Sequence, residues 1–246
     1  MVGKAVLVFG VAIFAVFAQV YSFETGNNDD VPIVRNDAEK ILKKLKAAVD
    51  KAMEQAQKAL DDAEKKIQEK AAAIESSAEA DMQTNEKTQE NAVAQQKQKA
   101  TDADVSIDDC LTGNEDKLVN LPAVYTQEMV TCTNAKISDG VSYAQDALNK
   151  VQNIVNEVEN IKQEIKDCGH GLKAVKCIAK LAVKIEKDIT SLPTKIETDI
   201  AATVVMIAQL EQKVNSCASD NVSKSKSEGD AVVAAVTTCV AGKIPA

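Results

Sequence analysis

Apolar residues recur at helical spacing through the first half of the chain. Between residues 37 and 101 the sequence contains no glycine and no proline. Its apolar positions follow one another about every 3.6 residues, which is the period of an amphipathic α-helix. They are Leu42, Leu45, Val49, Met53, Ala56, Leu60, Ala63, Ile67, Ala71, Ile74, Ala78 and Met82. The pattern predicts a long helix over 37–101, with Asn36 or Asp37 as its N-terminal cap.

This apolar stripe needs a surface to cover it. It can pack on another helix, in the same chain or in a second copy, or lie on a lipid surface. Its alanine content and its acidic surroundings disfavour the lipid surface, so we expect pairing with a helix. The stripe fades after Met82, and residues 83–104 are mostly polar. We expect a thin helix or a linker there, with 102–109 as the linker between two domains.

The second half of the chain carries two heptad arms that each end on a cysteine. From Ala147 to Cys168, and from Ile196 to Cys217, apolar or threonine positions alternate at spacings of four and three. This spacing is typical of helices that pack side by side. The segment Gly169-His170-Gly171 predicts the end of the first arm and a turn.

Prolines and polar runs divide the remainder of this half. Pro122 suits the first turn of a helix that leads to Cys132. Pro193 either kinks one long helix or separates two helices. Residues 218–230 are polar and are predicted to form a loop before a last short helix at 231–240. The fold class expected is all-α, a disulfide-linked helical hairpin or bundle with a long N-terminal amphipathic helix.

Six cysteines lie within the segment 110–240, which we expect to be one helical domain followed by a tail at 241–246. Their successive separations of 22, 36, 9, 40 and 22 residues are close to palindromic. In an antiparallel hairpin, facing residues have a nearly constant sum of their numbers. The spacing therefore predicts the nested disulfides Cys168–Cys177, Cys132–Cys217 and Cys110–Cys239. A metal site is the competing interpretation, but the chain has no C-x-x-C pair and one histidine.

The N-terminus has the pattern of a secretory signal peptide. Lys4 precedes an uncharged stretch from Ala5 to Ser22. Small residues before the cleavage site favour cleavage after Ser22, with cleavage after Ala18 as the second choice. A retained membrane anchor is the alternative, disfavoured because acidic residues follow at once and the apolar run is short for a span. We expect 1–22 to be removed, 23–36 to form a flexible polar leader, and the mature chain to be secreted, extracellular and without an integral membrane segment. An oxidising compartment agrees with the even number of cysteines.

Composition and charge limit the classes of molecule that the chain is expected to bind. The formal net charge is −8, so the chain lacks the basic surface that binds nucleic acid. It has no tryptophan, and beyond the signal peptide the only aromatic residues are Phe23, Tyr125 and Tyr143. So few rings do not build stacking platforms for bases or sugars. Nucleic acid is therefore excluded as an expected partner.

Two positions have a possible chemical role. His170 is the only histidine and could act as a general base, but a histidine near a helix C-terminus is the favoured interpretation. Asn221 begins the only Asn-X-Ser/Thr sequon and is predicted to be glycosylated in the polar loop. The sequence has no nucleophile elbow, P-loop or dinucleotide fingerprint, so we expect no catalytic residue, no metal and no cofactor.

The secretion signal, the alanine-rich, tryptophan-free helical sequence and the spacing of the last five cysteines together resemble the insect secreted proteins with a TsetseEP domain. The cysteines concerned are Cys132, Cys168, Cys177, Cys217 and Cys239. The resemblance covers about residues 110–240, and the Glu-Pro repeat of that family is absent. It implies an extracellular, disulfide-bonded helical domain from an arthropod.

The function expected from the sequence is that of a secreted, non-enzymatic interaction or structural protein. It would bind a protein partner or self-associate through coiled-coil-like helices. The alternative is an extracellular carrier that encloses a lipid or another apolar ligand between its helices.

Overall fold

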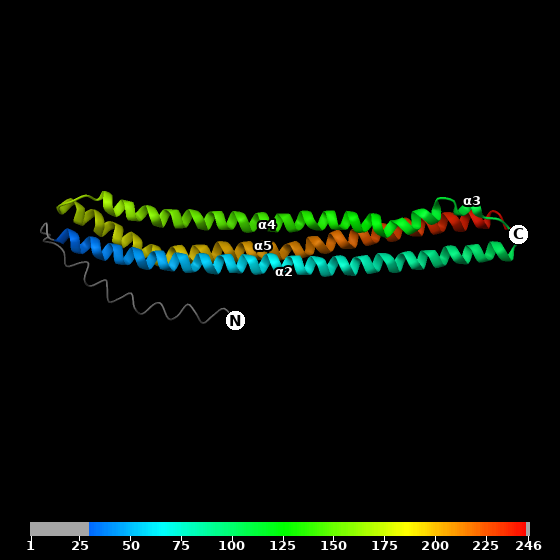
Figure 1. Cartoon of the computed structure of the whole chain (residues 1–246), viewed down its shortest axis with the longest axis horizontal. Coiled ribbons are helices and arrows are strands. Elements are labelled where there is room, and N and C mark those ends of the chain that lie inside the picture. The colour runs from blue at the N-terminus through cyan, green and yellow to red at the C-terminus, as the bar shows by residue number, and fades with distance from the viewer. Residues whose placement is uncertain (1–29, 245–246) are drawn as a thin grey trace. The chain divides into compact units, whose positions relative to one another are not determined.

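The computed structural model describes residues 30–244, and these form three long helices and one short one (Figure 1). They are α2 (Asp30–Asp102), α3 (Asp108–Leu111), α4 (Asn114–Asp167) and α5 (Leu172–Ala241). The described part of the chain contains no strand, which confirms the all-α class. The signal peptide predicted at 1–22 lies outside the described residues. None of the described helices has an apolar stretch that would cross a membrane.

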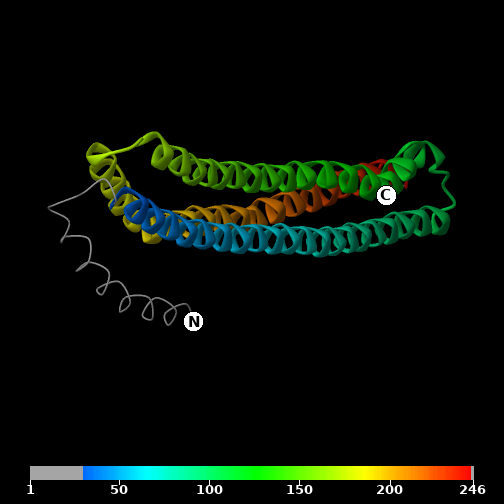
Figure 2. The same cartoon turned by 60° about the vertical axis from the view of Figure 1, so that its left-hand side comes forward.

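The described residues divide into two compact units, and each long helix contributes to both. The first unit takes its residues from Met1–Gln57 and Leu148–Ile200. The second takes them from Lys58–Ala147 and Ala201–Ala246. Within each unit, α4 and α5 run antiparallel, and α2 lies beside them (Figures 1 and 2).

The first unit is built on heptads. Buried positions on α2 and α4 follow one another at spacings of three and four. On α2 they are Ala38, Leu42, Leu45, Val49, Ala52 and Ala56, and on α4 they are Val151, Ile154, Val158, Ile161 and Ile165. Each helix therefore turns one continuous apolar seam toward its neighbours, as the 4-3 spacing predicts for this arm of α4.

The second unit uses a different repeat. On α2 the buried positions alternate at seven and four residues, so that the pattern repeats every eleven. They are Leu60, Ile67, Ala71, Ala78, Met82, Gln89, Val93 and Ala100. An eleven-residue repeat corresponds to about 3.67 residues per turn, whereas heptads correspond to 3.5 and wind the helices left-handedly. The seam of α2 thus continues beyond Met82 with small and polar members.

Gly140 lies inside α4, where its missing side chain makes room for α5. A Cβ atom at this position would lie 3.0 Å from Cδ1 of Leu210 and 3.9 Å from Cγ2 of Ile207. The missing side chain lets α4 come close to α5 inside the second unit, where Leu210 and Ile207 are buried.

The three disulfides are the nested set that the cysteine spacing predicts. Cys110–Cys239 joins α3 to α5, and Cys132–Cys217 joins α4 to α5. Cys168–Cys177 closes the turn between α4 and α5, in which Gly169 and Gly171 have positive φ angles of 72° and 78°. Glycine adopts this conformation without the penalty that a side chain brings.

The predicted domain borders are wrong in two places. The helix begins at Asp30, so residues 30–36 are helical and not part of a flexible leader. It also runs to Asp102 without fading, and only 103–107 separate it from α3, so the predicted linker at 102–109 is shorter. The long helix and the cysteine-rich segment do not form separate domains, because both units contain parts of each. The eleven-residue repeat, with its alanines and Gln89, hides this continuity from a search for large apolar residues.

Neither Pro122 nor Pro193 lies at a helix boundary. Pro122 lies inside α4, which begins at Asn114, and not in a first turn. Pro193 lies inside α5, which continues past it, so the two-helix alternative is excluded. The polar segment 218–230 is also part of α5 and not a loop. A proline costs a helix one backbone hydrogen bond, and the buried residues around it, such as Leu121 and Ile196, offset that loss through packing.

Candidate functional site

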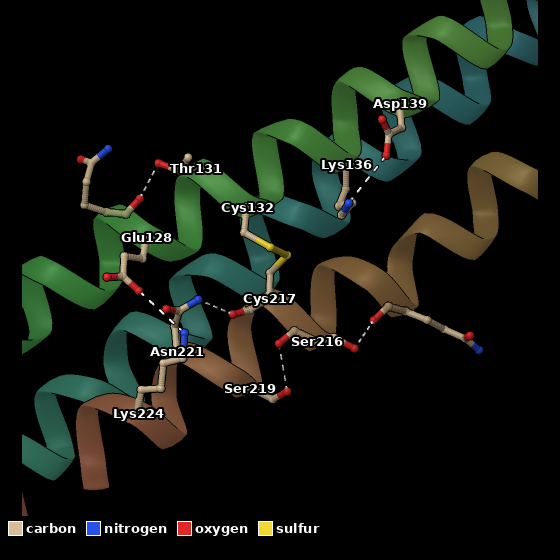
Figure 3. The surroundings of a disulfide bond; sticks show 12 residues. Glu128, Thr131, Cys132, Lys136, Asp139, Ser216, Cys217, Ser219, Asn221 and Lys224 are labelled. Atoms are coloured by element: carbon tan, nitrogen blue, oxygen red, sulfur yellow. Dashed lines mark hydrogen bonds and ion pairs between the residues drawn. A yellow bond between two sulfur atoms is a disulfide. The ribbon is translucent and has the colours of Figure 1, made fainter. Parts of the chain in front are cut away.

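The sequon residue Asn221 is buried beside a disulfide in the second unit. It lies one turn beyond Cys217 on α5, with a 5% exposed side chain. Its Nδ2 donates a hydrogen bond to the Cys217 carbonyl at 2.7 Å (Figure 3). The prediction that Asn221 lies in a loop is wrong, because Asn221 lies within α5. Its Nδ2 is the atom to which a glycan would attach. The packing of this helix therefore opposes glycosylation, which stays a prediction from the sequon alone.

A second buried polar side chain, Gln89, joins α2 to α5. Its Nε2 donates to the Lys226 carbonyl at 2.9 Å and to Oδ1 of Asp230 at 3.0 Å. Gln89 is 5% exposed, and its amide occupies the space beside Gly229, where any Cβ atom would overlap it. The pKa of Asp230 is held below its usual value by hydrogen bonds from Lys226 and then Gln89. We name Gln89, Lys226, Gly229 and Asp230 the Gln89 clasp.

Tyr125 forms a polar contact of the same kind between α4 and α5. Its hydroxyl donates a hydrogen bond to Oε1 of Glu228 at 2.7 Å, and Lys117 lies 3.7 Å from the other oxygen of that carboxylate. The bond to Glu228 is the main reason that the pKa of Tyr125 rises to about 12, and burial adds to it. The ring belongs to the hydrophobic core of the second unit together with Met129 and Val236.

A group that resembles a metal site lies at the Cys110–Cys239 disulfide. Asp109, Cys110 and Cys239 place one carboxylate and two sulfur atoms within 4.8 Å of one another. Both sulfurs belong to the disulfide, so neither is the thiolate that a metal would bind. Asp109 instead pairs with Lys243 at 2.6 Å, and this hydrogen bond lowers its pKa. This group therefore links α3 to the end of α5 through a disulfide and an ion pair.

The histidine considered as a general base lies in the turn of the first unit. His170 is exposed between Gly169 and Gly171, after the end of α4. The polar contact at this turn is made by Arg35, whose Nη2 donates to the Gly169 carbonyl at 2.8 Å. The structure therefore places an α2 side chain, Arg35, at the disulfide-closed turn.

The carrier hypothesis requires space between helices. One crevice of the first unit lies between α2 and α4, lined by Lys46, Val49, Asp50, Val155, Val158 and Glu159. The side chains around it leave no space for a water molecule. This crevice is closed to a lipid in the described conformation.

The structure brings together residues that the sequence did not single out. Gln89 stands in a polar run and Gly229 in a segment predicted to be a loop, so neither is marked by hydropathy. Their signal is positional. Gln89 follows Met82 by seven residues and precedes Val93 by four, which is the register of the buried seam.

Comparisons with protein families, with curated proteins and with solved structures found no match.

The Gln89 clasp predicts opposite effects of Gly229→Ala in two backgrounds. With Gln89 present, the new methyl group displaces the amide and breaks its bonds, so we expect a loss of about 1–2 kcal/mol in the free energy of unfolding. In a Gln89→Ala background the same substitution gains about 1 kcal/mol, because alanine favours the helix over glycine. Urea unfolding of the four proteins gives the comparison. Equal stabilisation in both backgrounds would contradict the clasp.

Tyr125 predicts a loss of stability at alkaline pH. An ordinary tyrosine pKa is about 10, so the unfolded chain loses the phenol proton before the folded chain does. The folded state then binds more protons than the unfolded state, and stability falls as pH rises between about 10 and 12. Absorbance titration of residues 23–246 with Tyr143→Phe follows Tyr125 alone, because the third tyrosine, Tyr21, lies in the predicted signal peptide. Glu228→Gln should lower its pKa more than the matched control Glu128→Gln, and equal effects would refute the assignment.

Proposed function

We propose that this chain is a secreted, non-enzymatic structural or interaction protein whose working part is the outer surface of disulfide-braced helices. The signal pattern at 1–22 and the complete pairing of six cysteines support an oxidising, extracellular location. The resemblance to the TsetseEP-domain proteins of insects supports the same location, and we keep that family as part of the proposal.

The proposal rests on the location of the apolar side chains, which are mostly buried between the helices. In each unit the seams of α2, α4 and α5 are buried among one another, and the other helix faces are largely exposed. The stripe from Leu42 to Met82 packs within its own chain, so it is not free to bind a second copy in this conformation. Eight large apolar residues are exposed on the described helices, among them Val124 on α4 and the neighbours Val205 and Met206 on α5. A protein partner would therefore meet a helical surface that is already folded.

A carrier of apolar ligands is the second candidate, and one observation favours it. The cysteines all lie beyond residue 109, so α2 covers α4 and α5 without a covalent bond to either helix. A ligand could enter only if α2 moved, since the crevice between α2 and α4 in the first unit has no space for it.

Protein purified without denaturation from the medium of expressing cells separates the two functions. We expect a mature chain that begins at Phe23, with all six cysteines oxidised. Organic extraction followed by mass spectrometry should release no apolar compound in a stoichiometric amount, because the seams are filled by side chains.

One apolar ligand per chain in that extract would favour the carrier and contradict the proposal. A chain that retains Met1 would contradict secretion by a cleaved signal. Light scattering at micromolar concentration gives the oligomeric state of the same sample, and ligand analysis of each resolved species shows whether assembly and ligand binding go together.

A further inference from the structure

The covalent bonds of the protein are distributed unevenly over its helices. Two disulfides tie α5 to α3 and α4, and the third closes the turn between α4 and α5. Helix α2, from Asp30 to Asp102, has no cysteine. Its only covalent link to the cross-linked helices is the segment 103–107. The hairpin of α4 and α5 is thus closed by disulfides, and α2 is not part of that closure.

The connection between α2 and the hairpin has the features of a hinge. Residues 103–107 are not helical, and Asp104 has a φ of 54°, in the region that side chains disfavour. Backbone bonds from Ala103 and Val105 reach back to α2 itself. Three residues past the segment, Cys110 is fixed to Cys239 on α5. The chain can therefore change direction here while the far side of the hinge stays anchored.

The contacts that hold α2 in the second unit are non-covalent, whereas two disulfides also hold the hairpin there. Helix α2 contributes eight buried side chains to this unit, of which four are larger apolar residues, three are alanines and one is polar: Leu60, Ile67, Met82, Val93, Ala71, Ala78, Ala100 and Gln89. Alanine removes little apolar surface from water. In this unit, the ion pairs Lys70–Glu211 and Lys97–Glu115 between α2 and the hairpin are partly exposed and contribute little.

The Gln89 clasp adds a polar contact to these apolar ones. The Gln89 side chain is buried, its part-buried hydrogen bonds cross from α2 to α5, and its position depends on the absence of a side chain at Gly229. Opening the seam would leave the Asp230 carboxylate and the Lys226 carbonyl without this donor. The clasp therefore adds a specific polar contact to the apolar side chains that hold this part of α2 against the hairpin.

We propose that the second-unit part of α2, residues 58–102, is a releasable strap. It detaches from the hairpin, starting at the hinge of residues 103–107, while α3, α4 and α5 stay together, and the Gln89 clasp holds it closed. Release uncovers the rest of the core that α2 shares in the second unit, including Leu121, Met129 and Val236. The device gives the protein a second, apolar face without unfolding the disulfide-linked helices.

Native-state hydrogen exchange on the oxidised full chain tests this strap. Without its packing a helix is marginal in water, so the detached segment opens its own backbone hydrogen bonds. Buried amides of 58–102 should therefore exchange through one shared opening, at least about tenfold faster than buried amides of α4 and α5 at the same low urea concentration. If the buried amides of all three helices exchange through a single common opening, the strap does not exist.

Two matched substitutions on α2 test the clasp. Gln89→Ala should speed the shared opening by about tenfold, the effect of losing roughly one buried hydrogen bond, without a comparable change in α4 and α5. Gln98→Ala is the control, since Gln98 is exposed and bonds only to Asp102 in its own helix. Equal exchange rates in the two variants would overturn the fastening role of Gln89.

Discussion

The disulfides between α5 and its neighbours are the constraint on which the rest of the fold depends. Cys217 and Cys239 lie 22 residues apart on α5, which is two eleven-residue repeats and brings them back to the same helix face. Their partners on α4 and α3 then fix the register of the antiparallel pair in the second unit. With that register set, Gly140 faces Leu210 and Tyr125 faces Glu228. A chain with few aromatic residues and many alanines gains from such bonds, because its core removes less apolar surface from water.

The same constraint explains the contrast between α2 and the hairpin. The alanines in the second-unit seam of α2 permit close packing of the helices, but each removes little apolar surface from water. A buried amide with a glycine beside it adds specificity, since an unpaired polar group in such a place would be costly. The fold thus combines a hairpin that disulfides close with a helix, α2, that only non-covalent contacts hold against it. The proposed function concerns the outer surface of the helices, and the releasable strap concerns the apolar core that it covers.

Sequence alone was enough to predict the fold class, the turn at Gly169 and the nested disulfides, because periodicity and antiparallel geometry act on residue spacing. It was not enough for the borders. The seam of α2 after Met82 contains Gln89 and Ala100, which a hydropathy pattern takes for a solvent-exposed face, and Pro122 carries a local preference that packing overrides. The burial of Asn221 depends on packing against the neighbouring helix. The pairing of Gln89 with Gly229 joins residues that are more than one hundred positions apart. No local pattern contains that information.

A tryptic map of the unreduced protein tests the central claim directly. Cleavage after lysine places each of the six cysteines on a separate peptide, so one digest shows every pair. The account predicts three linked pairs: 100–117 with 227–243, 118–136 with 214–224, and 167–173 with 177–180. A link between 118–136 and 167–173 would contradict the antiparallel hairpin and, with it, the register on which both units rest.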